Sequence, residues 1–211
     1  MKNFLQGRIE LVKYLFDNKV PNVHYADLIL IITAVLSACA SRRWKGNRDD
    51  RAKFIELLIN HSPEDLHTSW VSVPALLNYR PILKDRTPYG KPGHDLQVFS
   101  DNEIDKSIQE ARTLYAEVPY KKLKEFCYAS LIYKWLRCGY SHEYWADENI
   151  THVAATRRNA RVSYIARSNN NGIKRMVSFH LNYLIKLAEH HIKILPCSSS
   201  EPPCCWWIEQ E

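Results

Sequence analysis

The sequence predicts a mainly α-helical fold with a small C-terminal β-hairpin and a closing helix. Apolar residues recur at helical spacing through most of the first sixty residues, which indicates helices. Much later, at 161–167 and 173–179, two short segments rich in β-branched and aromatic residues indicate strands. Because the chain has 211 residues, 45% of them hydrophobic, it can bury a core. We therefore expect one domain over residues 1–195 and a flexible tail at 196–211.

Three helices are predicted in the N-terminal third. The first spans about residues 3–18, where the apolar residues keep a helical period. The second spans about residues 25–43 and is the most apolar. The third opens at Asp49 and Asp50, because acidic residues favour the first turn, and it ends near His61. Three helices in so short a stretch predict an all-α core.

The middle of the chain is expected to be less regular. Residues 63–100 contain five prolines and two glycines, which interrupt any long helix, so we expect a Pro-rich insertion with one or two short helices. Ser100 or Asn102 is then suited to cap a helix that runs to about Tyr115.

Another helix is predicted from about Leu123 to Arg137, with Gly139 as the residue that ends it. This places Arg137 at a helix end. Beyond it, the hairpin is expected over residues 161–179, its strands joined by a polar, glycine-containing loop. An amphipathic helix from about Leu181 closes the domain.

Charge and cysteine usage favour a cytoplasmic protein with an anionic partner. Lys plus Arg outnumber Asp plus Glu by 29 to 23, a net charge of +6 that weakly favours nucleic acid. The six cysteines lack the spacing of a disulfide framework or a zinc site. The adjacent His190 and His191 also lack partners at metal-ligand spacing. We therefore expect reduced thiols, no metal and no cofactor.

The apolar run at 28–38 leaves an alternative open. It ends in Leu-Ser-Ala-Cys at 36–39, which matches the small-residue pattern around a lipoprotein-type cleavage site. However, Asp27 directly precedes the run and no basic region adjoins it, whereas a signal peptide needs one. The run is also shorter than the ~20 residues that span a bilayer. We therefore interpret it as a buried core helix and expect no membrane association.

Residues 135–144 combine side chains suited to phosphate chemistry. Arg137 and His142 are separated by four residues, and the polar residues beside them are Ser141, Glu143 and Tyr144. Histidine can transfer protons because its unperturbed pKa, ~6.5, lies near neutral pH. Arginine stays charged and presents a planar fork that suits phosphate. Such a pair can serve RNA cleavage, which needs proton transfer and positive charge.

The Arg-x4-His spacing after a hydrophobic helix resembles the motif of the HEPN family (higher eukaryotes and prokaryotes nucleotide-binding). Residues 25–145 resemble its helical bundle. The patterns Leu-Arg-Cys-Gly-x-x-His-Glu-Tyr at 136–144 and Arg-Ala-Lys-Phe at 51–54 look like an uncharacterised bacterial branch of that family. The resemblance implies an HEPN-like bundle that forms a homodimer through the helices around Arg137, with the Arg and His of both copies in one cleft.

The resemblance further implies a metal-independent endoribonuclease of HEPN type that cleaves single-stranded RNA. His142 would be its acid and base and Arg137 its phosphate-binding group, with Ser141, Glu143 and Tyr144 in support. The expected setting is a toxin or phage-defence component, with an antitoxin or regulatory protein as a second partner. Cys138 departs from the family pattern, because active members usually carry Asn, Asp or His directly after the Arg.

Three other interpretations stay open. The chain could be a non-catalytic nucleic-acid or nucleotide-binding dimer, or a structural or regulatory scaffold. In the plainest case, Arg137 caps carbonyl groups at its helix end, while His142 and Glu143 stabilise the following turn.

Lysines and arginines also gather around the predicted hairpin. No acidic residue lies between Glu148 and Glu189. The expected RNA-binding residues there, called the basic strip below, are Arg157, Arg158, Arg161, Arg167, Lys174 and Arg175. Uncompensated positive charge attracts phosphate, and Tyr164 and Phe179 could stack unpaired bases. The alternative is a solvated basic face on an ordinary hairpin.

Overall fold

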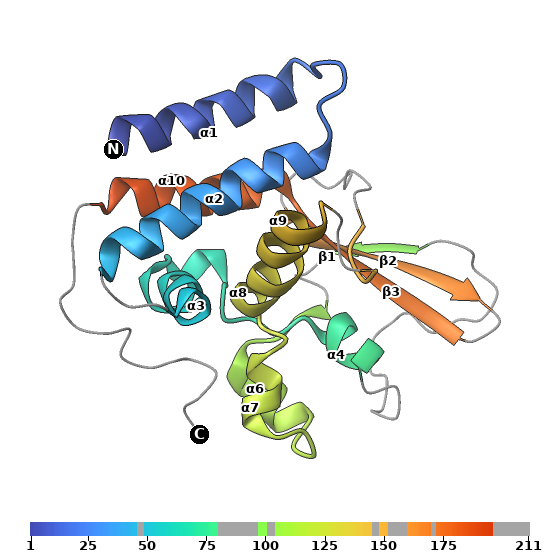
Figure 1. Ribbon diagram of the computed structural model, residues 1–211. Coiled ribbons are helices and arrows are strands. Elements are labelled where there is room, and N and C mark those ends of the chain that lie inside the picture. Colours follow the sequence, from blue (N-terminus) through green and yellow to red (C-terminus); the bar gives the residue numbers. More distant parts are fainter. Residues whose placement is uncertain are drawn as a thin grey trace.

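The chain is mainly helical, with a small antiparallel sheet at one side (Figure 1). The computed structural model describes residues 1–45, 49–79, 97–100, 104–144, 148–151, 160–169 and 172–195. The predicted tail, residues 80–96 of the Pro-rich insertion, and Arg157 and Arg158 of the basic strip lie outside the described residues. The predicted class, mainly α with a hairpin and a closing helix, is confirmed.

The N-terminal helices match their predictions closely. They are α1 (Lys2–Asp17), α2 (Tyr25–Arg43) and α3 (Asp50–His61). At the start of α3 the Asp49 side chain accepts a hydrogen bond from the backbone N–H of Ala52 (2.9 Å), which satisfies one of the free N–H groups of the first turn.

Helix α2 lies at the centre of the helical core. It contacts α1, α3 and the closing helix α10 (Leu181–Lys193), and Figure 1 shows α1, α2 and α10 side by side. Helix α2 is long and apolar enough to cross a membrane. Core helices of soluble proteins and signal sequences meet the same two criteria. Ile29, Ile32 and Leu36 are fully buried against its neighbours. Helix α2 is therefore the buried core helix that the sequence predicts.

The Pro-rich insertion contains the short helices η1 (Glu64–Leu66) and α4 (Val73–Tyr79), as predicted. It also contains a strand that the sequence did not predict, β1 (Gln97–Ser100). A four-residue strand carries little signal of its own, and here it forms by pairing with a strand more than sixty residues later.

The helix expected from Ser100 or Asn102 begins later, as α6 (Ile108–Leu114). Ser107 caps it: its hydroxyl accepts from the N–H of Glu110 (3.3 Å), and the Glu110 carboxylate accepts from the N–H of Ser107 (3.0 Å). This reciprocal capping box explains the shift, because it satisfies two N–H groups at once. Helix α7 (Tyr120–Lys124) follows.

The predicted helix end at Gly139 is wrong. After α8 (Tyr128–Leu131) the chain continues as a π-helical segment, η2 (Ile132–Cys138), and then as α9 (Gly139–Glu143). Gly139 has right-handed helical angles (φ −55°), and the left-handed residue that ends the helix is Tyr144 (φ 50°). The extra turn buries the ring of Tyr140, which outweighs the preference of glycine for a helix end.

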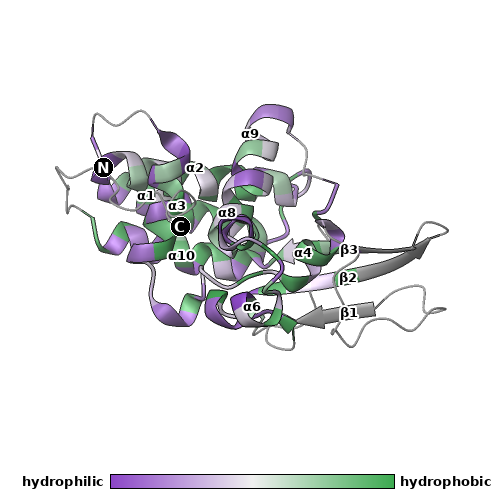
Figure 2. Cartoon of the chain, turned by 90° about the horizontal axis from the view of Figure 1, so that it is seen from below, coloured by the Kyte–Doolittle hydropathy of each residue, from purple (hydrophilic) through white to green (hydrophobic). Residues whose placement is uncertain are grey.

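The sheet has the strand order β1-β2-β3 and is antiparallel throughout. Strands β2 (Val162–Asn169) and β3 (Gly172–Phe179) form the predicted hairpin, with Tyr164 opposite Val177. Figure 2 shows hydrophobic stretches gathered where the helices face one another, whereas the end of α9 is hydrophilic and projects from the body.

A buried carboxylate joins the sheet to the helices. Asp105 accepts hydrogen bonds from the hydroxyls of Tyr128 on α8 and Tyr164 on β2, and from the backbone N–H of Val73 on α4 (3.0 Å). The Tyr164 hydroxyl also lies within hydrogen-bond distance of the Ser72 hydroxyl (2.9 Å). All five residues are buried. Donors from three elements thus converge on one side chain.

A second buried polar group is His191 on α10, which is 0% exposed. Its pKa is lowered to about 3, mainly by burial and additionally by the nearby His190, His61 and Arg43. Its Nε2 lies 3.0 Å from the Ser62 hydroxyl. The imidazole is therefore neutral in the folded chain at neutral pH.

We expect acidification to destabilise the fold through His191. The unfolded chain binds a proton below pH ~6.5, whereas the folded chain does so only near pH 3. Stability is therefore complete above the unfolded pKa and falls by up to about 1.4 kcal/mol per pH unit as the pH drops toward 3. Urea unfolding at several pH values measures the slope. The slope of unfolding free energy against pH should be smaller in His191→Leu, whereas the exposed His24→Leu should keep the slope of the unmodified protein. Equal slopes in the unmodified protein and both variants would contradict the role assigned to His191.

Candidate functional site

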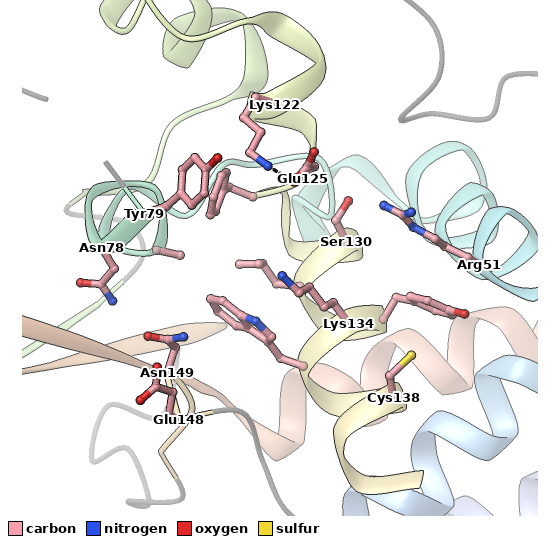
Figure 3. Close-up of a pocket in the computed structure, with 15 residues that line it drawn as sticks. Arg51, Asn78, Tyr79, Lys122, Glu125, Ser130, Lys134, Cys138, Glu148 and Asn149 are labelled. Atoms are coloured by element: carbon pink, nitrogen blue, oxygen red, sulfur yellow. Dashed lines mark hydrogen bonds and ion pairs between the residues drawn. The ribbon is translucent and has the colours of Figure 1, made fainter. Parts of the chain in front are cut away.

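A cavity of about 700 Å³ lies beside the π-helical segment. Its walls come from α3, α4, the α7–α8 region, η2 and the stretch at 148–149 (Figure 3). Three side chains in it are cationic and four are aromatic: Arg51, Lys122, Lys134, Tyr79, Phe126, Tyr133 and Trp135. The size falls within the range typical of small-molecule sites, about 300–1,000 Å³. π-Helical turns also occur frequently at functional sites.

One face of the α8–η2–α9 helix forms a wall of this cavity. Ser130, Lys134 and Cys138 follow one another at intervals of four residues, and all three line it (Figure 3). Side chains four apart lie above one another on a helix. His142 comes four residues after Cys138, so it continues this ridge one turn beyond the cavity, where its side chain is exposed. We call positions 130, 134, 138 and 142 the ridge.

Arg137 lies beside the ridge and within the helix, not at its end. Its Nη2 lies 2.9 Å from Asp50 Oδ2 on α3, and its guanidinium carbon lies 5.4 Å from the centre of the Tyr133 ring. Nη1 lies 3.9 Å from Cys138 Sγ. These contacts contradict the interpretation of Arg137 as a cap for carbonyl groups at a helix end.

The ion pair with Asp50 is only partly shielded. The Arg137 side chain is 21% exposed and that of Asp50 is 53% exposed. Such a pair contributes little stability, about 0–1 kcal/mol. A phosphate could therefore compete with Asp50 for the guanidinium.

Tyr133 and Cys138 complete this part of the site. Burial raises the pKa of Tyr133 to about 12, and the neighbouring Cys138 thiol is the next cause. The phenol therefore remains protonated at neutral pH and can act as a hydrogen-bond donor. Cys138 is half-buried between Lys134 and His142 on the ridge.

The predicted supporting residues separate into two groups. Ser141 and Glu143 are exposed on α9 beside His142. Tyr144 instead donates its hydroxyl to the Asp27 carboxylate at the start of α2. This bond lowers the pKa of Asp27 and raises that of Tyr144. The Tyr144 hydroxyl thus connects the end of α9 to the start of α2.

No family model, curated protein or solved structure matches the chain.

The described part of the basic strip is not a uniformly exposed face. Arg175 is buried, and its backbone bonds both ends of the Asn78 amide (2.5 and 3.2 Å). Arg161 is half-buried, with its guanidinium 5.5 Å from the centre of the Trp70 ring. Arg167 and Lys174 are paired positions across the hairpin. Arg161 and Arg175 thus face the body of the protein rather than open solvent.

Sequence reasoning missed Asp50, Arg51 and Lys134 as parts of the site. The Arg51 motif was noted as a family pattern without a role, and Lys134 could have been found from its spacing of four to Cys138 and eight to His142. No group of three or more His, Cys, Asp or Glu within the described part of the chain is placed to hold a metal ion. The cavity offers guanidinium and ammonium cations, the carboxylates of Glu125 and Glu148, and aromatic rings, and the imidazole of His142 lies one turn beyond it.

Proposed function

We propose that the chain is an HEPN-like, metal-independent endoribonuclease that binds single-stranded RNA along the ridge and cleaves it beside His142. The observation that carries the proposal is the continuity of the ridge: Lys134 lies in the cavity, and the exposed His142 follows two turns later. A nucleotide bound by cations and rings would thus leave its neighbouring phosphate near an accessible imidazole.

The proposed roles follow from the chemistry of each group. His142 takes the proton of the ribose 2′-hydroxyl or gives one to the departing 5′-oxygen. Arg137 and Lys134 stabilise the charge that develops on the phosphate oxygens. The exposed ring of Tyr79 offers a surface on which an unpaired base could stack, a contact that tolerates any sequence.

The proposed setting is a homodimer in the cytoplasm, within a toxin or phage-defence system that includes an antitoxin or regulatory protein. The described cysteines, Cys39, Cys127 and Cys138, are in the thiol form, which supports a reducing compartment.

The experiment is cleavage of single-stranded RNA by the purified protein in EDTA. We expect fragments that end in 2′,3′-cyclic phosphate, because the attacking group is the neighbouring 2′-hydroxyl, which leaves the 5′-oxygen as a hydroxyl on the other fragment. The same sequence as DNA should remain intact. RNA that carries one 2′-deoxynucleotide should resist cleavage at that position. Cleavage that requires added metal, or that proceeds on DNA, would contradict the proposal.

A second candidate is an RNA- or nucleotide-binding protein without cleavage. The Asp50–Arg137 ion pair favours it, because it occupies the guanidinium that catalysis would need. In that case fluorescence anisotropy should show salt-sensitive RNA binding that Lys134→Glu weakens, with intact RNA throughout. Absence of any binding at low salt would leave the scaffold interpretation.

A further inference from the structure

Helix α1 carries an apolar stripe that the protein does not cover. Among the side chains that the structure describes, seven large apolar ones are exposed, and three of them, Phe4, Leu11 and Tyr14, lie on one face of α1. The opposite side of α1, with Leu5, Ile9 and Val12, is buried against the core. The helix is thus apolar on two faces, of which the fold uses one.

The exposed face has the spacing of a helix-pairing seam. Phe4, Gly7, Leu11 and Tyr14 are separated by three, four and three residues, the pattern with which two helices interlock. Gly7 is an unfavourable residue in the middle of a helix. A Cβ added there would meet nothing within 4 Å, so packing inside the chain does not require the glycine. Because glycine has no side chain, position 7 leaves a space between Phe4 and Leu11 that a side chain of another molecule can fill. We call this space the seat.

We propose that this stripe, defined by Phe4, Gly7, Leu11 and Tyr14, is the surface through which two copies of the chain associate, with their α1 helices antiparallel. A two-fold axis between the helices sets Leu11 of one copy in the seat at Gly7 of the other and brings Phe4 opposite Tyr14. Each copy offers the same surface, as a symmetric dimer requires. This interface differs from the one that the family resemblance implies, through the helices around Arg137, and it does not depend on the proposed nuclease activity.

The area suits a weak, reversible dimer. Phe4 and Tyr14 are 60% and 61% exposed, so each leaves roughly 100–150 Å² of aromatic surface in water. With the rest of the stripe, two copies bury on the order of 1,000 Å², the lower end for specific interfaces. Near Arg137, where the family resemblance places the interface, Tyr144 is the one exposed large apolar residue among those described.

The charges on α1 favour a second copy over a lipid surface. Helices that lie on membranes are rich in Lys and Arg on their polar face. The charges on α1 have both signs, with Lys2, Arg8 and Lys13 against Glu10 and Asp17, and Lys13 forms an ion pair with Glu10 (3.1 Å). The helix therefore lacks the uniformly basic polar face of a membrane-binding helix, and a protein partner of mixed charge suits it better.

Sedimentation velocity over a dilution series of the full chain tests the proposal. We expect a reversible monomer–dimer equilibrium whose dissociation constant rises by more than about tenfold in Phe4→Glu, because the aromatic contact between Phe4 and Tyr14 is lost at both ends of the stripe and a charge is buried there. Gly7→Gln should weaken the dimer similarly by filling the seat. In dilute, monomeric protein Gly7→Gln should raise the melting temperature, since it replaces a glycine within a helix. A loss of dimer through misfolding would lower that temperature instead.

Two further measurements distinguish the rival surfaces. Tyr79→Ser and Tyr144→Ser each remove an exposed ring outside α1 and should leave the dimer unchanged. A dimer that Tyr144→Ser disrupts and Phe4→Glu preserves would overturn the proposal in favour of an interface near Arg137. A chain that stays monomeric, or that binds phosphatidylcholine–phosphatidylserine vesicles through Phe4, would also overturn it.

Discussion

His142→Ala is expected to lower the rate of RNA cleavage in EDTA by ~10²–10⁴-fold, the usual contribution of a positioned acid or base. The side chain is exposed at the end of α9, so its removal should leave the fold intact. RNA affinity should change little, because the cavity and its cations remain. Single-turnover cleavage with saturating protein measures the chemical step separately from binding.

The matched control is His24→Ala, which removes another exposed imidazole, at the start of α2. It should retain full activity. Added imidazole should restore part of the activity of His142→Ala but not that of Arg137→Ala, because only the first lacks a proton-transfer group. Cleavage by His142→Ala at the original rate would place the chemistry elsewhere.

Asp105→Ala is expected to lower the free energy of unfolding by about 3–5 kcal/mol, because it leaves three buried donors without their shared acceptor. The hydroxyls of Tyr128 and Tyr164 and the N–H of Val73 would all lose this partner inside the core. Urea unfolding followed by circular dichroism measures the change. Tertiary contacts between the sheet and α8 should weaken first, since Asp105 links them.

Graded variants separate this effect from general damage to the core. Tyr128→Phe removes one donor and keeps the ring, so the loss should be about 1–2 kcal/mol. Tyr14→Phe makes the same change on the exposed face of α1 and should alter stability by less than about 0.5 kcal/mol. A loss below about 1 kcal/mol in Asp105→Ala would show that the carboxylate is not needed for the network.

The elements that the sequence predicted are those that form from local patterns. The three N-terminal helices and the hairpin each carry their own periodicity and boundary residues, and α2 begins and ends at the predicted positions. Strand β1 depends on pairing with β2, and the turn beyond Gly139 depends on the burial of Tyr140 against distant residues. Neither dependence is visible in a local window of sequence.

In the candidate site, too, the residues that could be predicted are those that lie close together in the sequence. Arg137 and His142 could be singled out because they share one helix and a recognisable spacing. Their surroundings could not, since Asp50 reaches Arg137 across 87 positions of the chain. The π-helical segment also lacks a sequence signal, yet it sets which side chains of this helix line the cavity.

The contact between the first and last described helices constrains how the protein is made. Lys2 Nζ donates to the backbone carbonyl of Lys193 (3.0 Å), and α10 packs against both α1 and α2. During translation, α1 and α2 therefore emerge from the ribosome long before the helix that covers them. The nascent chain carries a largely apolar α2 without this cover until α10 has been made, a condition that favours aggregation.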